Sequence, residues 1–243
     1  MSKITVGDSH IEIFGNSHAA VITGAPPSGK KVPKQKELPF GRGFTDVNPD
    51  YSFRTWFLGP ILAYNFRQNH LQKVYKHIKE NPKVFQRDNV VIMLAVGEID
   101  CRVHLPKYVG KRSVENVVEE CVLRYHEAIL ELAHAGHKVA VMGAIPSLCD
   151  ESLRKKMSPK EQVYNMSGDT FTRNKVAKSW EEIHSSLCNK DQIPYVSIYR
   201  HLVDDKGMTN ESMFCDFIHL SHEKTINHWL SSFEDNGIIV QKQ

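Results

Sequence analysis

A serine near the beginning of the chain and an Asp–His pair near its end are the residues whose types suggest nucleophilic chemistry. Ser9 lies in the run Gly7–His10, directly after the apolar segment Ile4–Val6, and Asp216 and His219 are three residues apart. A serine hydroxyl is a weak nucleophile until a positioned imidazole accepts its proton. The imidazole in turn needs a carboxylate that fixes its tautomer. We therefore predict that Ser9 is a nucleophile, His219 its general base and Asp216 the group that orients the base.

Four sequence blocks follow one another in a fixed order along the chain. They are Gly7–Ser9, the glycine turn Leu58–Pro60, the block Gly97–Asp100 after an apolar run, and Asp216–His219. Together they resemble the SGNH, or GDSL-type, hydrolase superfamily, and the run from Gly97 to His104 is most similar to a poorly characterised branch of it. The resemblance implies a flavodoxin-like three-layer α/β/α sandwich with a central parallel sheet.

The same resemblance implies a serine-dependent hydrolase of acyl esters that works through an acyl-enzyme on Ser9. Carbohydrate O-acetyl esters are one substrate class that it suggests. Two alternatives stay open, an acyl or acetyl transferase that uses the same residues and a non-catalytic domain that binds a ligand. In each case the expected partner is a small molecule or a carbohydrate ester. Basic side chains would favour a partner that is an anion. No cofactor is expected.

A second serine motif competes with the first. Ser17 lies in the run Gly15–His18, which repeats the pattern and also precedes an apolar stretch. The prediction favours Ser9 because the apolar segment before it is typical of a buried strand, and because Asp8 matches the family block where Asn16 does not.

The donors that would stabilise an oxyanion are less complete than in the family. The superfamily usually has an asparagine at the position of Ile99, and an isoleucine side chain cannot donate a hydrogen bond. The backbone amides of Ser9 and Gly59 are the remaining candidates, with Gly24 as an alternative glycine. Four polar residues follow the apolar run at 89–96, namely Glu98, Asp100, Arg102 and His104. Two interpretations of them stay open: Arg102 or His104 replaces the missing donor, or the group is a structural ion-pair network.

Two further groups of residues have a functional and a plainer interpretation. Arg173 follows Gly168-Asp169 and either binds a carboxylate or phosphate in a bidentate manner or lies on a helix surface. Asp216, His219 and His222 could ligate a metal ion, but their spacing matches no standard structural zinc site, so no metal is expected.

Composition excludes several classes of protein. The chain has 243 residues, a length that allows one α/β domain or two small ones, and its hydrophobic fraction of 41% is enough for a sizeable core. A net charge of only +3 argues against a nucleic-acid binder. No apolar run approaches the roughly 20 residues of a membrane span. Met1–Lys3 leads directly into the first expected strand without a signal peptide, and five cysteines without a Cys-x-x-Cys pair suggest reduced thiols. We expect a cytoplasmic protein of unknown oligomeric state that binds neither nucleic acid nor membrane.

The elements that must position these residues alternate between strands and helices. Apolar runs predict strands, and apolar stripes with a 3.6-residue period predict helices. The expected strands cover 4–6, 89–96, 138–142 and 195–198, and the expected helices cover 60–79 with a break near Gln68–His70, 113–135, 171–188 and 221–235. This alternation predicts a parallel sheet covered on both faces, within a single domain over 1–243.

A basic segment rich in Gly, Pro and Lys, at about 24–50, is expected to be a long loop. Its run Gly24–Lys31 fits a phosphate-binding loop except at the last position, where Lys31 replaces the Ser or Thr that holds Mg²⁺. Pro33 and Pro39 also interrupt the helix that such a loop needs. We therefore favour a solvated basic loop or a lid that attracts anionic substrates.

Overall fold

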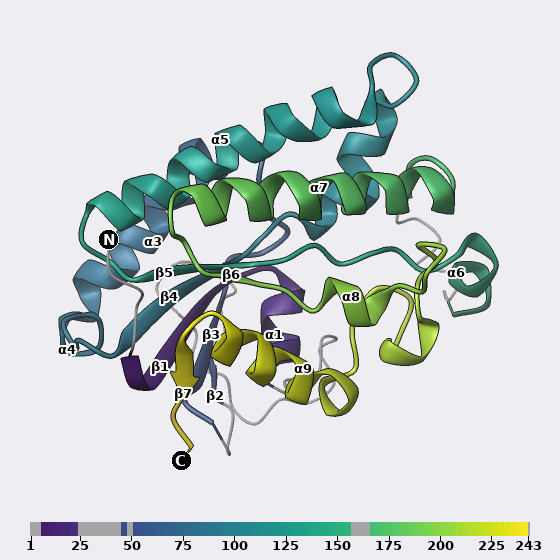
Figure 1. Ribbon diagram of the computed structural model, residues 1–243. Coiled ribbons are helices and arrows are strands. Elements are labelled where there is room, and N and C mark those ends of the chain that lie inside the picture. Colours follow the sequence, from purple (N-terminus) through teal and green to yellow (C-terminus); the bar gives the residue numbers. More distant parts are fainter. Residues whose placement is uncertain (1–5, 24–44, 48–50, 157–165, 243) are drawn as a thin grey trace.

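The computed structural model describes residues 6–23, 45–47, 51–156 and 166–242. Its sheet lies at the centre of the molecule (Figure 1). The strands are β1 (Val6–Gly15), β2 (Thr45–Val47), β3 (Phe53–Phe57), β4 (Val90–Ala95), β5 (Val139–Met142), β6 (Tyr195–Val196) and β7 (Ile238–Val240). They are ordered β2-β3-β1-β4-β5-β6, and β7 pairs with the first part of β1. All pairs are parallel except β2 with β3.

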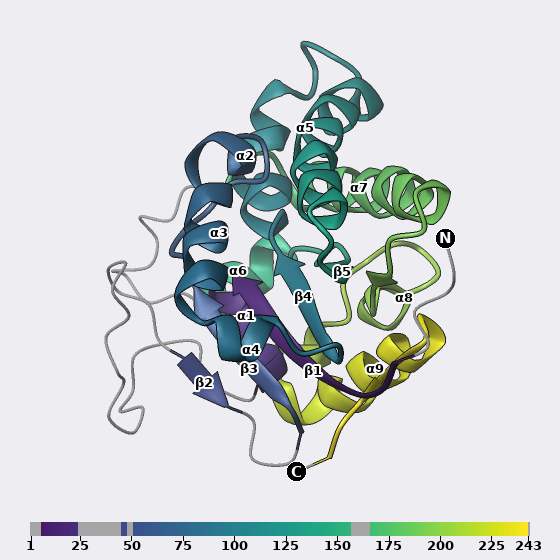
Figure 2. The same cartoon turned by 90° about the vertical axis from the view of Figure 1, so that its left-hand side faces the viewer.

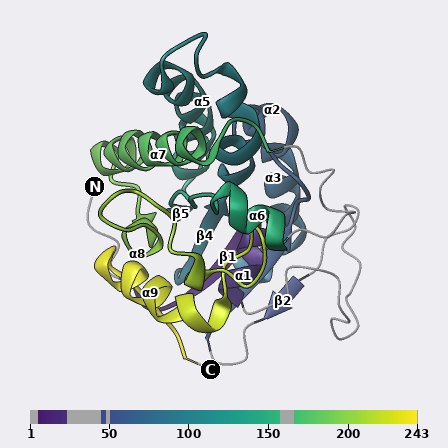
Figure 3. The same cartoon turned by 90° about the vertical axis from the view of Figure 1, so that its right-hand side faces the viewer.

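Helices cover both faces of this sheet, as the views in Figures 2 and 3 show. They are α1 (Ser17–Thr23), α2 (Phe66–Asn69), α3 (Leu71–Glu80), α4 (Pro82–Phe85), α5 (Val114–His134), α6 (Asp150–Lys156), α7 (Thr170–Lys190), α8 (Tyr199–Leu202) and α9 (His222–Asp235). A π-turn, η1 (Asp100–His104), and two 3₁₀ turns, η2 (Leu105–Tyr108) and η4 (Glu211–Met213), complete the described elements. The predicted three-layer α/β/α sandwich is confirmed.

Alternation along the strands divides the core into two clusters. Phe14 of β1 packs on the face covered by α2, α3, α5 and α7, together with Tyr125 and Trp180. Ile11 and Ile13 point to the opposite face, where α1 and α9 pack. Successive residues of a strand point to opposite faces, so one ten-residue strand supplies both cores.

Most of the elements predicted from hydrophobic period lie where they were expected. β4, β5, α5, α7 and α9 fall within two residues of the predicted bounds, and the break in the helical segment at 60–79 lies at His70, between α2 and α3. Ser113 caps α5, since its Oγ accepts a hydrogen bond from the Asn116 amide at 3.2 Å. Ser221 stands at the corresponding position of α9, but its side chain caps nothing there.

The first strand is longer than predicted, and its length changes the position of the first motif. β1 continues to Gly15, although His10 and Glu12 interrupt its apolar pattern. Glu12 is fully buried, accepts a hydrogen bond from the Trp56 indole, and lies 2.7 Å from His10 Nε2 and 3.5 Å from Arg54 Nη1. A buried carboxylate is tolerated when it is paired in this way.

Within the basic segment at about 24–50, which was expected to be a loop, residues 45–47 form β2. The Gly24–Lys31 pattern and the alternative glycine Gly24 lie outside the described residues. None of the five cysteines, all of which the structure describes, forms a disulfide. Within the described ranges, none of the helices combines the length and the apolar character that crossing a membrane requires.

Candidate functional site

The described structure places Ser17, His219 and Asp216 in a chain of contacts. Ser17 Oγ lies 2.7 Å from His219 Nε2, and His219 Nδ1 lies 2.7 Å from Asp216 Oδ2. His219 is buried, whereas Ser17 is half-buried and so remains accessible. A hydroxyl on one ring nitrogen and a carboxylate on the other form the arrangement of a nucleophile, its base and the orienter of that base.

Ser17 stands on a tight strand-to-helix turn. Gly15 ends β1 and Ser17 begins α1, with only Asn16 between them. A side chain at Gly15 would overlap the Ala95 carbonyl oxygen, so the turn can approach β4 only because this residue is glycine. Asn16 Oδ1 accepts a hydrogen bond from the His18 amide at 3.0 Å and thereby caps the start of the helix.

The ends of three strands align at this turn. Gly15 is in register with Phe57 of β3 and with Ala95 of β4. The segments that follow these strands therefore leave the sheet at one edge, where ligands bind in parallel α/β sheets. Glu98 and Gly59 both belong to these segments. Residues that follow these two strands thus lie at the same edge of the sheet as the turn that carries Ser17.

Asp216 is held by its own loop. Its Oδ1 accepts hydrogen bonds from the backbone amides of Ile218 at 2.8 Å and of His219 at 2.6 Å, while Oδ2 faces the imidazole. Partial burial acts to raise the pKa of this carboxyl, but the hydrogen bond and charge of His219 outweigh it and leave the pKa below its ordinary value. The carboxylate therefore stays ionised beside the ring.

The position predicted for Ser9, on a turn after a first strand, is wrong. Ser9 lies within β1, is fully buried, and is in register with Val240 of β7. Its carbonyl oxygen accepts a hydrogen bond from the Gln241 amide. The structure instead brings His219 to Ser17, the serine of the competing motif.

A buried ionic network lies next to this triad. Arg102 donates hydrogen bonds from Nε and Nη2 to Glu98, and His18 Nε2 lies 3.4 Å from Glu98 Oε2. The His18 ring centroid is 5.2 Å from that of His219. Burial acts to raise the pKa of Glu98, but Arg102 and His18 hold it well below its usual range. Burial lowers the pKa of His18, although the charge of nearby Glu98 acts to raise it.

His18 is the residue of this network that sequence reasoning missed. Its only signal is that it follows Ser17 directly in the competing motif. The ring is 1% exposed, and neither ring nitrogen makes a well-formed hydrogen bond to a described residue, although Nε2 lies close to Glu98.

Asp100 and His104 lie apart from this network. Asp100 Oδ2 accepts the Ala63 amide at 2.7 Å, and Oδ1 accepts from the Cys121 thiol at 3.8 Å. Both residues line a cavity of about 260 Å³ together with Tyr64 and Tyr108. The expected ion pair of Arg102 is therefore formed with Glu98 and not with Asp100. His104 does not reach the network, and burial lowers its pKa.

We expect Asp100→Asn to stabilise the protein, increasingly as the pH rises. Burial raises the pKa of Asp100 to about 7, against the opposing effect of hydrogen bonds from the Ala63 and Tyr64 amides. An unfolded chain ionises this carboxyl near the ordinary value of 3.8, so between these two values only the unfolded state loses its proton. The folded state is therefore progressively disfavoured as pH rises, by about 1.4 kcal/mol per pH unit and at most about 4 kcal/mol in all.

Urea unfolding at about pH 4 and about pH 8 measures this effect. The asparagine side chain keeps one oxygen that can accept the hydrogen bond of the Ala63 backbone amide. The free energy of unfolding of the variant should therefore match that of the wild type near the lower pH and exceed it at the higher one. An equal difference at both values would show that Asp100 does not change its charge state.

The other predicted residues divide between the site and the scaffold. Gly59 has a φ of +90°, and the Leu58 amide before it donates to the Gly15 carbonyl at 2.8 Å, so Gly59 lies beside the turn that carries Ser17. Arg173 is 1% exposed and bonds to Asp150 Oδ1 at 2.5 Å and to the Gly168 carbonyl at 2.6 Å. The guanidinium is thus neither on a helix surface nor available for a bidentate ligand.

The metal interpretation of the C-terminal histidines finds no support. His222 Nδ1 lies 2.8 Å from the Val21 carbonyl oxygen, and both ring nitrogens of His219 are engaged by Ser17 and Asp216.

Comparison with solved structures identifies the fold. The chain is similar to a GDSL-like lipase from Bacteroides thetaiotaomicron, with a TM-score of 0.54 and 10% identity over 94% of this chain and 87% of that one. It is also similar to a protein of Streptococcus pneumonia described as a proposed platelet activating factor, with a TM-score of 0.53 and 16% identity over 96% and 86% of the two chains. A scan of family models and a search of curated proteins found no match. The fold expected from the sequence resemblance, that of an SGNH or GDSL-type hydrolase, is confirmed.

Proposed function

We propose that this protein is a serine hydrolase of acyl esters that forms an acyl-enzyme on Ser17. The observation that carries the proposal is the contact of Ser17 Oγ with His219 Nε2 at 2.7 Å, on a half-buried serine. The pairing of the same imidazole with Asp216 supports it, and so does the likeness in fold to a GDSL-like lipase. The nucleophile predicted from the sequence was Ser9, and the contact with His219 supports Ser17 in its place.

Each residue of the triad has a defined part in this reaction. His219 Nε2 accepts the Ser17 proton while Oγ attacks the ester carbonyl carbon, and Nδ1–H donates to Asp216, which stabilises the imidazolium. Collapse of the tetrahedral intermediate breaks the bond to the leaving alkoxide, which takes the proton from Nε2. Water then attacks the acyl-enzyme with His219 as its base, which releases the acid and restores the serine.

The oxyanion needs donors, because these are commonly the largest electrostatic contribution to catalysis. The backbone amides of Ser17 and Gly59 are the candidates at this edge of the sheet. Ile99 supplies no side-chain donor. We propose that the buried network of His18, Glu98 and Arg102 compensates for it, with His18 as the member nearest to the triad.

A covalent probe tests the proposed function directly. A fluorophosphonate labels only an activated serine, and peptide mass spectrometry locates the adduct. The tryptic peptide over residues 4–30 contains both Ser9 and Ser17, and we expect its fragmentation to place the adduct on Ser17. We also expect hydrolysis of esters in a panel that runs from acetyl to longer acyl chains and includes acetylated sugars. Transfer of the acyl group to an added sugar hydroxyl, faster than to water, would identify the transferase alternative. Absence of both labelling and turnover would support the domain that only binds a ligand.

Removing the charge of Arg102 alone should destabilise the protein severely. Arg102→Met leaves Glu98 buried and charged without its main partner, and breaking a buried ion pair in this way costs about 3–5 kcal/mol. The double variant Glu98→Gln, Arg102→Met removes both charges and should recover much of that loss. Urea unfolding of the two variants measures the difference.

Turnover of the double variant separates the two interpretations of the network. If stability returns but ester hydrolysis stays at least about tenfold below the wild type, the network serves the reaction. If both return, Glu98 and Arg102 only brace the loops.

A further inference from the structure

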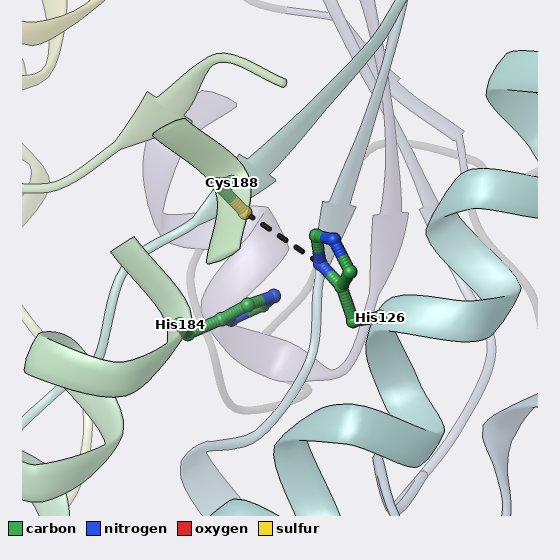
Figure 4. A group of neighbouring side chains, drawn as sticks. All are labelled: His126, His184 and Cys188. Carbon is green, nitrogen blue, oxygen red and sulfur yellow. Dashed lines mark hydrogen bonds between the residues drawn. The ribbon is translucent and has the colours of Figure 1, made fainter. Parts of the chain in front are cut away.

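Three side chains capable of binding a metal converge in the interior, between α5 and α7. They are His126 from α5 and His184 and Cys188 from α7, drawn in Figure 4. One ligand atom from each lies within 4.8 Å of the others, and all three residues are buried. None of them belongs to the Ser17 site.

The spacing of these residues follows from helix geometry. His184 and Cys188 are four residues apart, and residues at this spacing point from the same face of a helix. α5 and α7 lie along each other on one face of the sheet (Figure 1). His126 projects from α5 toward the pair on α7 (Figure 4). Two ligands from one helical turn and a third from its neighbour form a rigid cradle that needs no loop.

The two histidines differ in their hydrogen bonds. His184 is 0% exposed, and neither of its ring nitrogens has a hydrogen-bond partner in the described structure. Buried polar groups are nearly always paired, and an exception calls for an explanation such as a bound ion. The ring makes T-shaped contacts with Trp180 and Tyr195 and a tilted contact with Tyr125.

His126 is already oriented as a ligand would be. Its Nε2 lies 2.8 Å from Asp191 Oδ2, while Nδ1 faces Cys188 Sγ at 4.0 Å. Metal-bound histidines almost always donate their other ring N–H to a carboxylate or carbonyl, which fixes the tautomer and the ring orientation. Asp191 is such a carboxylate.

We propose that His126 Nδ1, one ring nitrogen of His184 and Cys188 Sγ bind a zinc ion. Zinc takes His nitrogens at about 2.0–2.1 Å and Cys sulfur at about 2.3 Å in tetrahedral geometry, which separates nitrogen from sulfur by about 3.5 Å. The observed 4.0 Å between Cys188 Sγ and His126 Nδ1 is close to that separation, so small rotations of the side chains suffice. Binding releases the proton of the Cys188 thiol, and water would take the fourth position of the tetrahedron. The single thiolate leaves the ion with one positive charge, which Asp191 offsets from the outer shell.

The site lies away from the serine chemistry, so its role is to join α5 to α7. A ligand that binds only the folded state stabilises it, and the effect grows with the ratio of free ligand to its dissociation constant. Zinc should therefore raise the melting temperature of the whole chain without being required for labelling of Ser17. This inference does not depend on the proposed function.

The test uses the full chain, stripped with a chelator and reloaded. We expect about one zinc per chain by mass spectrometry of the metal, and a fall in melting temperature on chelation that added Zn²⁺ reverses. Co²⁺ in its place should give the intense near-ultraviolet absorption of thiolate bound to cobalt. These bands report Cys188 as a ligand and are independent of any enzyme activity.

Matched variants locate the ion. Cys188→Ala should lose the zinc and the cobalt–thiolate absorption, as should His184→Asn, whereas Cys101→Ala removes another buried thiol and should retain both. Zinc retained by Cys188→Ala, no stoichiometric zinc in the wild type, or binding of Cu⁺ but not Zn²⁺ would each overturn the assignment. In the second case the three side chains form an ordinary buried cluster. If Cys188→Ala fails to fold, the cobalt spectrum of the wild type still decides.

Discussion

Ser17→Ala should abolish fluorophosphonate labelling and lower ester turnover by roughly 10⁴- to 10⁶-fold, as the loss of a triad nucleophile does. The reason is geometric, because Ser17 supplies the only hydroxyl that the described structure brings within hydrogen-bond distance of His219 Nε2. The substitution removes one oxygen from a half-buried position, so the melting temperature should change little. Probe labelling and initial rates on a short acyl ester measure the effect.

Ser9→Ala is the matched control, because it removes the same atom from the strand that leads to Ser17. Ser9 is fully buried within β1, so this change should act on stability and leave labelling intact. An unlabelled Ser9→Ala protein that is folded, beside a labelled Ser17→Ala protein, would reverse the assignment of the nucleophile.

His219→Ala should match the loss of Ser17→Ala, and Asp216→Asn should lower turnover by on the order of 10⁴ while the protein stays folded. The asparagine can present its amide NH₂ to Nδ1, which favours the tautomer that cannot accept the serine proton. Because a general base must be neutral to act, wild-type activity should fall as the pH is lowered. Pre-steady-state and steady-state rates across pH, with circular dichroism as the check on folding, test both variants.

A different outcome would point to metal-dependent hydrolysis. If a chelator removes activity from a protein that is still folded at the assay temperature, and the acid limb is missing, the triad is not the catalyst. A chelator that only lowers the melting temperature agrees with the triad and with the zinc proposed between α5 and α7.

The sequence predicted the layers of the fold well because its strongest signals are long and periodic. Helix α5 shows this, since its stripe through Val118, Cys121 and Ile129 is buried as expected. β3 was missed because Arg54 and Thr55 hide its apolar alternation, and β7 because three residues carry too little pattern. The predicted first strand was too short because Glu12 interrupts the apolar pattern. Its burial is possible because Trp56 and Arg54 pair with it, and the sequence does not show these contacts.

The candidate site was predicted at one end and misplaced at the other. Asp216 and His219 could be paired from the sequence because they are only three residues apart. The choice between Ser9 and Ser17 depended on where β1 ends, which a tertiary contact of Gly15 with β4 decides. Arg102 could be placed near the site, but its pairing with Glu98 and the approach of His18 are long-range contacts without a sequence signal.

The contact between Ser17 and His219 also has a consequence for synthesis, because the two residues are 202 positions apart. A ribosome that adds about 5–20 residues per second needs roughly 10–40 s to travel from one to the other. During that interval the serine exists without its base, and a hydroxyl without a base is chemically inert. The proposed nucleophile of the nascent polypeptide therefore stays dormant until the segment after β6 has been made and has docked.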